Sequence, residues 1–279
     1  MTLRTTDRCP HMLHRRRRAL QGAMAAVLFI AVPRLAAAPP VPTVYQVGEE
    51  LTYNVRFSFI DLGQIKITTL RQVTADGYRG YFTRANIASY KSIPFVSAQA
   101  IFESTVDSGS FSRAFLGRSR EGDDWSFARY TFQYDRGVGL LELGPRDTLI
   151  TRRDTMALTG KVQDGLSVFF WAREYLFSGK VLTAPCVISE KKTRATIDFR
   201  TEQESVEIDA VDYPIDTQHF IGSGDFVGFY GLTGAFEGWF SNDAARVPIL
   251  AKMQVFIGNV TIELMEYKRT GWTPPRGKD

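Results

Sequence analysis

The stretch that decides the fold runs from residue 229 to residue 267 and reads FYGLTGAFEGWFSNDAARVPILAKMQVFIGNVTIELMEY. Apolar and polar residues alternate with a period of two in three successive segments. Side chains of a strand point alternately to its two faces, whereas the faces of a helix repeat every 3.6 residues. The segments are separated by Ser241-Asn242-Asp243 and by Gly258-Asn259, residue types that tolerate tight turns. This stretch therefore predicts consecutive antiparallel strands with one face in a core.

The same alternation recurs through most of the chain, beginning with the segment from Leu51 to Phe57. Only residues 162–178, VQDGLSVFFWAREYLFS, place apolar residues three and four apart, which predicts an amphipathic helix. Asp164 is the predicted N-cap, and Gly179 is predicted to end the helix. The predicted fold is mainly β, either a curved antiparallel sheet or a partly closed β-barrel, with one main α-helix covering or plugging it.

The first 38 residues read as a signal peptide. Four arginines, Arg15 to Arg18, precede an apolar run from Ala19 to Val32, and Ala36 to Ala38 offer a cleavage site. The run is shorter than the ~20 residues that span a bilayer. We therefore expect export to the periplasm, with a membrane anchor as the alternative if the leader is retained. Residues 39–45 are predicted to be a linker, 46–268 a single β-rich domain and 269–279 a flexible tail.

The leader also explains the basic charge of the chain. The sequence has 34 Lys and Arg against 30 Asp and Glu, and seven of the former and one of the latter lie within residues 1–38. The remainder has 27 against 29, a net charge of −2. The basic balance thus gives no reason to expect a nucleic-acid partner.

Several segments together resemble a bacterial exported family known as domain of unknown function 3108. These segments are VGEELTYNVRFSFIDLGQIKI near the start, QDGLSVFFWAR at 163–173 and FEGWFSNDAARVPILAKMQVFIGNVTIEL near the end. They span most of residues 46–265. The chain departs from the family pattern at Ala244 and Ala245, where more charge is expected. The resemblance implies an exported or periplasmic β-rich domain, but no reaction.

The sequence holds few candidates for catalysis or metal binding. His219 is the single histidine after the leader, and its strand context predicts a solvent-facing side chain. Cys186 lies in the apolar run PCVI, which predicts a buried small residue. No metal-ligand spacing is recognisable, and Glu121, Asp123 and Asp124 read as a solvated loop. The glycines from 222 to 228 lack the spacing of a phosphate loop and read as a hinge. We expect no cofactor, no metal and no catalytic residues.

The candidate site residues fall into an apolar and a polar group. A curved sheet lined with aromatic residues can hold an apolar ligand such as a lipid, and a filled aromatic core is the alternative. The candidate ligand-binding residues are Phe169, Phe170, Arg173 and Trp239. The candidate polar residues are Asp164, Ser167, Glu237, Asp243 and Arg246, for which capping, ion pairs and turn formation are sufficient roles.

Three functions are compatible with these patterns. The leading hypothesis is a non-enzymatic envelope protein that binds an apolar ligand or a protein partner. The first alternative is a hydrolase of envelope polymers that uses carboxylates such as Glu237 and Asp243. The second alternative is a structural assembly factor.

Overall fold

The computed structural model describes residues 44–75, 77–93, 97–121, 123–227, 233–255 and 258–278. The predicted leader and its cleavage site lie outside the described residues. The described chain contains one α-helix, α1 (Ser167–Tyr175), which continues into the short 3-10 helix η1 (Leu176–Ser178). The strands are β1 (Glu50–Phe57), β2 (Ile60–Ala75), β3 (Tyr78–Ser89), β4 (Ala98–Asp107), β5 (Ser112–Glu121), β6 (Asp124–Gln133), β7 (Val138–Gly144), β8 (Arg152–Ala157), β9 (Val181–Ile188), β10 (Lys191–Val206), β11 (Ile215–Val227), β12 (Thr233–Ser241), β13 (Pro248–Val255) and β14 (Gly258–Lys268).

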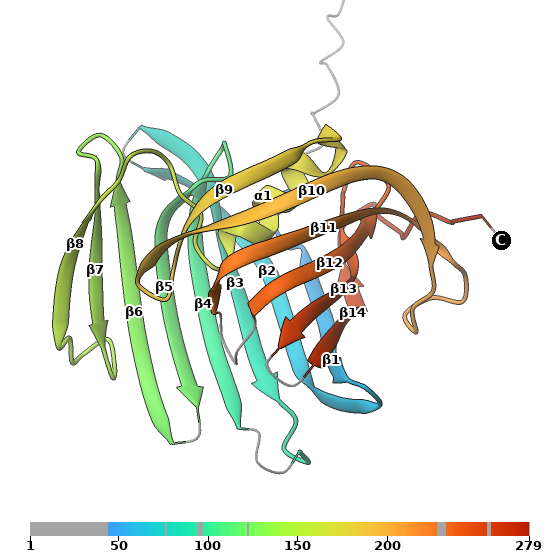
Figure 1. The fold of residues 1–279 in the computed structure, drawn as a ribbon, viewed down its shortest axis with the longest axis horizontal. Helices are drawn as coiled ribbons and strands as arrows, with labels where there is room; N and C mark the ends of the chain where they lie inside the picture. The colour runs from blue at the N-terminus through green and yellow to red at the C-terminus, as the bar shows by residue number, and fades with distance from the viewer. Residues whose placement is uncertain are drawn as a thin grey trace, which may run out of the picture. The chain divides into compact units, whose positions relative to one another are not determined.

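All described strands belong to one antiparallel sheet in the order β8-β7-β6-β5-β4-β3-β2-β1-β14-β13-β12-β11-β10-β9 (Figure 1). Strands that follow each other in the sequence are neighbours in the sheet, and β1 pairs with β14. The order is therefore that of an up-and-down barrel in which one pair of neighbours, β8 and β9, is missing. The mainly β fold with a partly closed barrel and one helix is confirmed.

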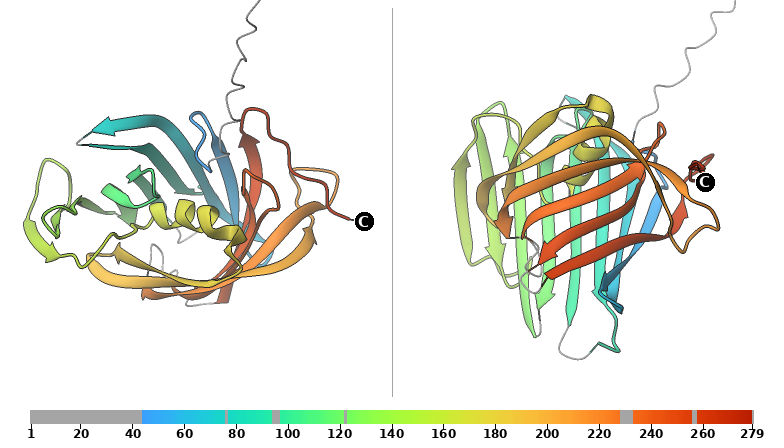
Figure 2. Two further views of the ribbon diagram at one scale, coloured as in Figure 1. Left: turned by 90° about the horizontal axis from the view of Figure 1, so that it is seen from above. Right: turned by 45° about the vertical axis from the view of Figure 1, so that its right-hand side comes forward.

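The helix lies at the open seam, because it joins the two strands that do not pair. Seen from above, α1 lies between the wall that ends at β8 and the wall that ends at β9 (Figure 2). The segment before the helix partly bridges the seam. Ser112 of β5 donates its N–H to Val162 (3.0 Å), and Gln163 pairs with Cys186 of β9. The apolar face of the helix thus covers sheet surface on both sides of the gap.

The core is built on both faces of the helix. Leu166 and Phe170 pack with Leu51, Tyr53 and other residues of β1–β4 and β13–β14. On the other face, Trp171 and Leu176 pack against Phe199 and Phe220 of β10 and β11. Because each wall has its own contact surface on the helix, the helix holds the two walls of the curved sheet together.

Two local predictions need correction. The helix begins at Ser167, not at residue 162, because the preceding residues bridge β5 and β9. Gly222 is a strand residue and not a hinge: a Cβ there would lie 2.4 Å from the ring of Phe236. Gly228 lies outside the described residues. Gly179 does end the helical segment, with a left-handed φ of 59°.

The C-terminal segment, expected to be a flexible tail, is held by the domain as far as Lys278. Asp216 donates its N–H to Pro275 (2.9 Å), Gly277 donates to Pro214 (2.8 Å), and Ser205 donates to the carbonyl of Lys278 (2.9 Å). Polar composition gave the wrong signal, because these contacts use the backbone of the segment and not its side chains.

Candidate functional site

The first anchor of the helix is the buried carboxylate of Asp164. One oxygen accepts hydrogen bonds from the N–H groups of Leu166 and Ser167, both at 2.8 Å, and the N–H of Asp164 donates to the Ser167 hydroxyl at 2.7 Å. This reciprocal arrangement is a capping box. The second oxygen accepts from the hydroxyls of Ser104 (2.6 Å) and Ser112 (2.5 Å) on β4 and β5. The N-cap residue of α1 is Leu166 and not the predicted Asp164, which caps the turn just before the helix and ties it to the first wall.

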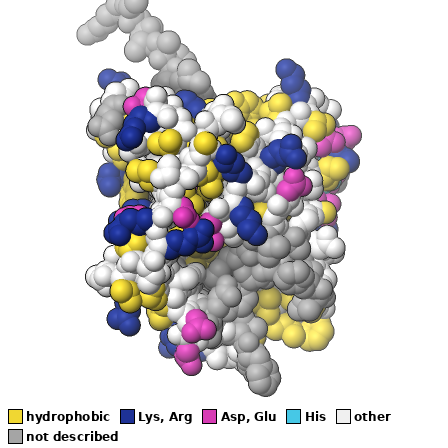
Figure 3. Space-filling view, turned by 60° about the vertical axis from the view of Figure 1, so that its left-hand side comes forward, with side chains coloured by type: hydrophobic (Ala, Val, Ile, Leu, Met, Phe, Trp, Pro, Cys, Tyr) yellow, Lys and Arg dark blue, Asp and Glu magenta, His cyan; other side chains and the backbone are white. Residues whose placement is uncertain are grey.

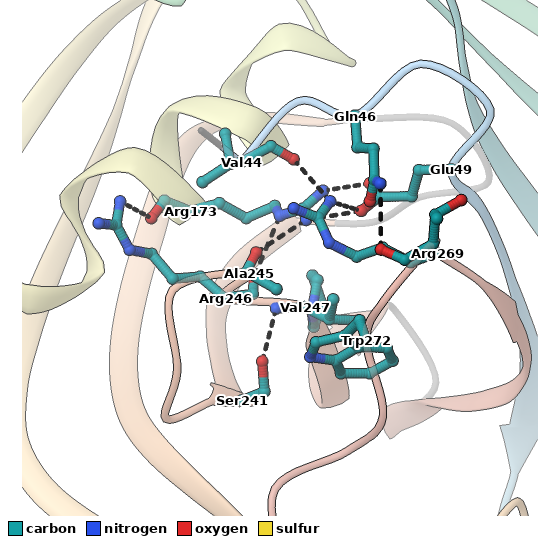
Figure 4. A network of polar contacts seen from close by, with 12 residues as sticks. Val44, Gln46, Glu49, Arg173, Ser241, Ala245, Arg246, Val247, Arg269 and Trp272 are labelled. Carbon is teal, nitrogen blue, oxygen red and sulfur yellow. Dashed lines mark hydrogen bonds and ion pairs between the residues drawn. The ribbon is translucent and has the colours of Figure 1, made fainter. Parts of the chain in front are cut away.

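The second anchor is the guanidinium of Arg173, which is fully buried (Figure 4). It forms a bidentate pair with Glu49, at 2.7 and 3.1 Å. It also donates to the carbonyls of Ala245 (2.9 Å) and Arg246 (3.0 Å) in the turn between β12 and β13. Glu49 lies just before β1, so a single side chain connects the helix to both ends of the domain sequence.

Two further arginines complete this network. Arg269 donates to the Glu49 carboxylate and to the carbonyl of Val44. Arg246 donates to the carbonyls of Arg173 (3.2 Å) and Glu174 (3.0 Å), which are among the last carbonyls of the helix. A cation at that position also complements the negative end of the helix dipole. The polar network therefore fixes the C-terminal end of α1.

Burial and charge act against each other in the two anchors. Burial by itself would raise the pKa of Glu49, but the charges and hydrogen bonds of Arg173 and Arg269 hold that pKa below its ordinary value. Burial raises the pKa of Asp164, although the hydroxyls of Ser104 and Ser112 counteract part of the effect. A pair of cations therefore compensates the buried carboxylate at one anchor, and only neutral donors do so at the other.

The candidate polar residues thus have structural partners. Asp243 uses one oxygen for the Ser241 hydroxyl and the N–H groups of the turn, and the other for the indole of Trp272, at 2.6 Å. Glu237 lies farther along β12, paired with Lys252 at 3.4 Å. Ser241, the residue that bonds Asp243, lies four strand residues from Glu237, which corresponds to about 13 Å. The carboxylate pairs of glycosidases lie ~5–9.5 Å apart, so this arrangement does not join Glu237 and Asp243 as such a pair.

The aromatic candidates are placed on different surfaces. Phe170 is fully buried on the helix and stacks on Tyr45, whereas Phe169 is half-buried beside it. Trp239 is on the opposite face of β12 from Phe240, stacked on His219 at 4.8 Å. The structure therefore does not bring Phe169, Phe170, Arg173 and Trp239 together around one cavity.

His219 differs from the prediction, since it is buried and not solvent-facing. Its ring lies against Trp239, and its nitrogens lie 3.5 Å from Glu204 and 3.5 Å from Glu237. Trp239 is the cross-strand partner of His219 on β12, a pairing that the local alternation could not reveal. Cys186 is buried as predicted, and burial raises the pKa of its thiol to about 12.

The sequence reasoning missed an apolar strip on the inner face of the sheet. Phe236, Met253, Val260 and Phe57 are direct cross-strand partners on β12, β13, β14 and β1. They face inward, because Phe240 on the same face of β12 packs in the cluster of the helix residues. Alternation was visible in each strand, but only the register places these four residues side by side.

Exposure of the inner face increases with distance from the helix. Near α1, the inward residues Phe240, Ile249 and Tyr53 are 4%, 0% and 3% exposed. Four residues farther along the same strands, about 13 Å away, Phe236, Met253 and Phe57 are each only half-buried, whereas Val260, between Met253 and Phe57 in the row, is 5% exposed. The helix therefore fills one end of the interior, whereas the other end presents apolar side chains that the described residues do not fully cover.

Among the described residues, no group of three or more His, Cys, Asp or Glu could hold a metal ion. Two surface clefts of about 270 and 330 Å³ are lined mostly by residues of β5–β8 and their turns. None of the candidate ligand-binding residues lines either of them. In the part of the chain that the structure describes, no helix is long and apolar enough to cross a membrane.

The family is shown by a match over residues 52–265 to the model of the protein family of unknown function DUF3108. The chain belongs to the DUF3108 family. A beta-barrel-like protein of domain of unknown function DUF1849 from Brucella abortus has a similar fold, with a TM-score of 0.53 and 10% identity over 81% of this chain and 99% of that one. No curated protein matches this chain.

A second solved structure aligns less closely. It carries the name "putative exported protein with YmcC-like fold", comes from Bacteroides fragilis and has a TM-score of 0.30 and 9% identity, over 80% of this chain and 97% of that one. The DUF1849 protein shares the beta-barrel-like architecture with this DUF3108 member, and at 10% identity the likeness concerns the fold alone.

Proposed function

We propose that this DUF3108 protein is a non-enzymatic, exported protein of the cell envelope that binds an apolar ligand, such as a lipid chain. The ligand would lie on the inner strip formed by Phe57, Val260, Met253 and Phe236. The observation that carries the proposal is the exposure gradient, because apolar side chains left partly uncovered inside a curved sheet are a typical setting for an apolar ligand. Export to the periplasm is proposed from the arginines and the apolar run of the leader, and a retained leader would anchor the protein in the membrane.

The structure of the helix end supports this location. Phe170, Arg173 and Asp164 are buried and have their polar atoms or rings engaged. A ligand at that end would have to displace buried ion pairs, at a cost of several kcal/mol. At the other end, a ligand would cover apolar surface that is already partly exposed. The inner strip consists of apolar residues, so the ligand would not have to displace an ion pair from it.

Binding of the fluorescent apolar probe N-phenyl-1-naphthylamine to the full chain tests the proposal. Met253→Glu places a charge on the strip and should weaken probe binding at least tenfold, since an unpaired carboxylate is costly on an apolar surface. Gln254→Glu is the matched control: it adds the same charge to the neighbouring residue, on the opposite face of β13, and should bind the probe as the parent does. If the parent shows no saturable binding, or if both variants bind equally, the proposal is wrong.

A further inference from the structure

The end of the sheet at which the inner strip is exposed also carries projecting apolar residues. In an up-and-down sheet, every second connection lies at the same end, here the connections β1–β2, β3–β4, β5–β6 and β7–β8 of the first wall. Residues 94–96 of the β3–β4 connection lie outside the described residues. Phe59 in the first connection is 87% exposed, and Ile60 beside it is 40% exposed. Trp125, next to the β5–β6 connection, is 50% exposed, and Leu149 in the β7–β8 connection is 53% exposed.

The opposite end of the same wall has a different character. The connections β2–β3, β4–β5 and β6–β7 expose small or polar residues, including Ser108 and Asp135. In the described part of these three connections, no large apolar side chain is exposed. Among the described connections of this wall, the projecting residues thus lie at the end at which Phe57 and the inner strip are reached, although Val47, just before β1 at the helix end, is also 49% exposed. We call Phe59, Ile60, Trp125 and Leu149 the apolar rim.

The spacing of the apolar rim favours a lipid bilayer over a protein as its partner. Four strand spacings separate the β1–β2 connection from β5–β6, and six separate it from β7–β8, which corresponds to about 19 and 29 Å. Protein interfaces concentrate their energy in a contiguous, closely packed centre. Among the described residues of these connections, one or two exposed apolar side chains at each of three separated positions do not form such a centre. A lipid bilayer can take up each residue independently, and Trp and Phe are residue types that its interface favours.

Charges next to the apolar rim are already compensated within the protein. Arg56 pairs with Asp61 at 3.0 Å, and Arg118 pairs with Asp147 at 3.2 Å. Arg120 lies 2.9 Å from Asp123. Basic and acidic side chains also lie beside one another on the face drawn in Figure 3. Contact with a bilayer would therefore depend on apolar insertion, and it should respond weakly to salt and to the fraction of anionic lipid.

We infer that the apolar rim inserts into the surface of a lipid bilayer, and that an apolar ligand moves between that bilayer and the adjoining inner strip. This inference rests on the function proposed above, because the ligand is assigned to the strip. Its new content is the source of the ligand and the surface through which the protein meets it. The orientation follows directly: the apolar rim faces the bilayer, and the β4–β5 turn with Ser108 points away.

Site-specific labelling tests the orientation whether or not the leader is retained. A bimane label is placed at Phe59→Cys or, as the control, at Ser108→Cys, in the full chain carrying Cys9→Ser. The buried Cys186, whose thiol pKa is raised by burial to about 12, should not react. Vesicles of phosphatidylethanolamine and phosphatidylglycerol that contain a brominated lipid should quench the label at 59 several-fold more than the label at 108. Equal quenching, or stronger quenching at 108, would overturn the inference.

Transfer of the probe separates this inference from the proposed function. The double variant Phe59→Ser/Trp125→Ser should bind N-phenyl-1-naphthylamine from solution as the parent does, but take it up from the same vesicles about tenfold more slowly. Val181→Ser, which alters an exposed apolar residue at the start of β9 (63% exposed), should leave both quantities unchanged. Unchanged transfer by the double variant refutes the role of the rim and leaves the strip intact. Loss of probe binding by the parent refutes the proposed function itself.

Discussion

The two ends of the curved sheet differ in what covers their apolar surface. At the helix end, α1 covers the inner face, and each of its termini is held by a buried polar anchor, Asp164 or Arg173. At the other end, the inward residues Phe236, Met253 and Phe57 stay half-buried. One sheet with one alternating pattern therefore has a completed core at one end and an uncovered apolar surface at the other.

This difference separates stability from binding. The helix end concentrates buried hydrogen bonds and ion pairs, whose loss leaves partners unsatisfied in a low dielectric. The apolar rim exposes apolar surface to water, so removing it costs folding little. Substitutions at the helix end should therefore change the free energy of unfolding, and substitutions at the other end should change binding.

The largest expected effect is that of Arg173→Met. Methionine fills part of the volume but leaves the Glu49 carboxylate buried beside a single arginine, Arg269, and frees the carbonyl of Ala245. We expect a loss of ~3–5 kcal/mol in the free energy of unfolding, measured by urea titration. Arg153→Met is the control, since that side chain is 69% exposed in its ion pair with Glu142, and it should cost little. Equal free energies of unfolding for the two variants would contradict this prediction.

A smaller loss is expected for Asp164→Ala. The substitution removes the cap of the turn just before α1 and leaves the buried hydroxyls of Ser104 and Ser112 without their acceptor. Relief of a buried carboxylate with a raised pKa offsets part of the cost. We expect a net loss of ~2–3 kcal/mol in the free energy of unfolding. Asp135→Ala, in an exposed turn, should stay near the parent value, and a neutral Asp164→Ala would contradict the anchoring role.

The pH dependence of the Arg173 anchor should be smaller still. The folded state lowers the pKa of Glu49, so this group contributes stability above its ordinary value of 4.5 and loses it as the pH falls through the lowered folded-state pKa. The destabilisation caused by Glu49→Gln should thus be ~1–3 kcal/mol near neutral pH and shrink below about pH 4.5. The contribution of Asp164 to stability has the opposite pH dependence, because its raised pKa favours the folded state at low pH. A Glu49→Gln effect independent of pH would show that the charge is unimportant.

The smallest expected change in stability is that of Phe59→Ser. The side chain is 87% exposed, so its removal should alter the free energy of unfolding by less than ~0.5 kcal/mol, measured in the same titration. The same substitution contributes to the expected loss of vesicle-dependent transfer. A destabilisation comparable to that of Asp164→Ala would remove the contrast between the two ends.

Local patterns were sufficient for much of the fold. Alternation predicted the strands, the stripe in residues 162–178 predicted the helix, and the acidic and glycine residues at 164 and 179 predicted its limits to within a few residues. The single cysteine of the domain was correctly expected to be buried. These predictions succeeded because each depends on residues close together in the sequence, where the period of the side chains is set by the backbone.

Predictions that depended on distant partners were incomplete or wrong. Glu49 lies within the segment VGEELTYNVRFSFIDLGQIKI, but nothing in the sequence shows that it meets Arg173, which is 124 positions away. The solvent-facing position predicted for His219 is wrong because its ring lies against Trp239 of the neighbouring strand, 20 positions away in the sequence. The sequence also could not show that Phe170 of the helix lies fully in the core, 0% exposed, and that the half-buried row of Phe57, Met253 and Phe236 lies elsewhere.

The sequence by itself determined an alternating, mainly β chain with one helix, since those periods are properties of short segments. Only the tertiary structure decided which strands meet, that β8 and β9 stay apart around the helix, and that Phe236, Met253, Val260 and Phe57 form one row. Cross-strand register joins residues far apart in the chain, and the same alternation is compatible with many registers. Which apolar face becomes core and which stays open is therefore settled only when the walls close around the helix.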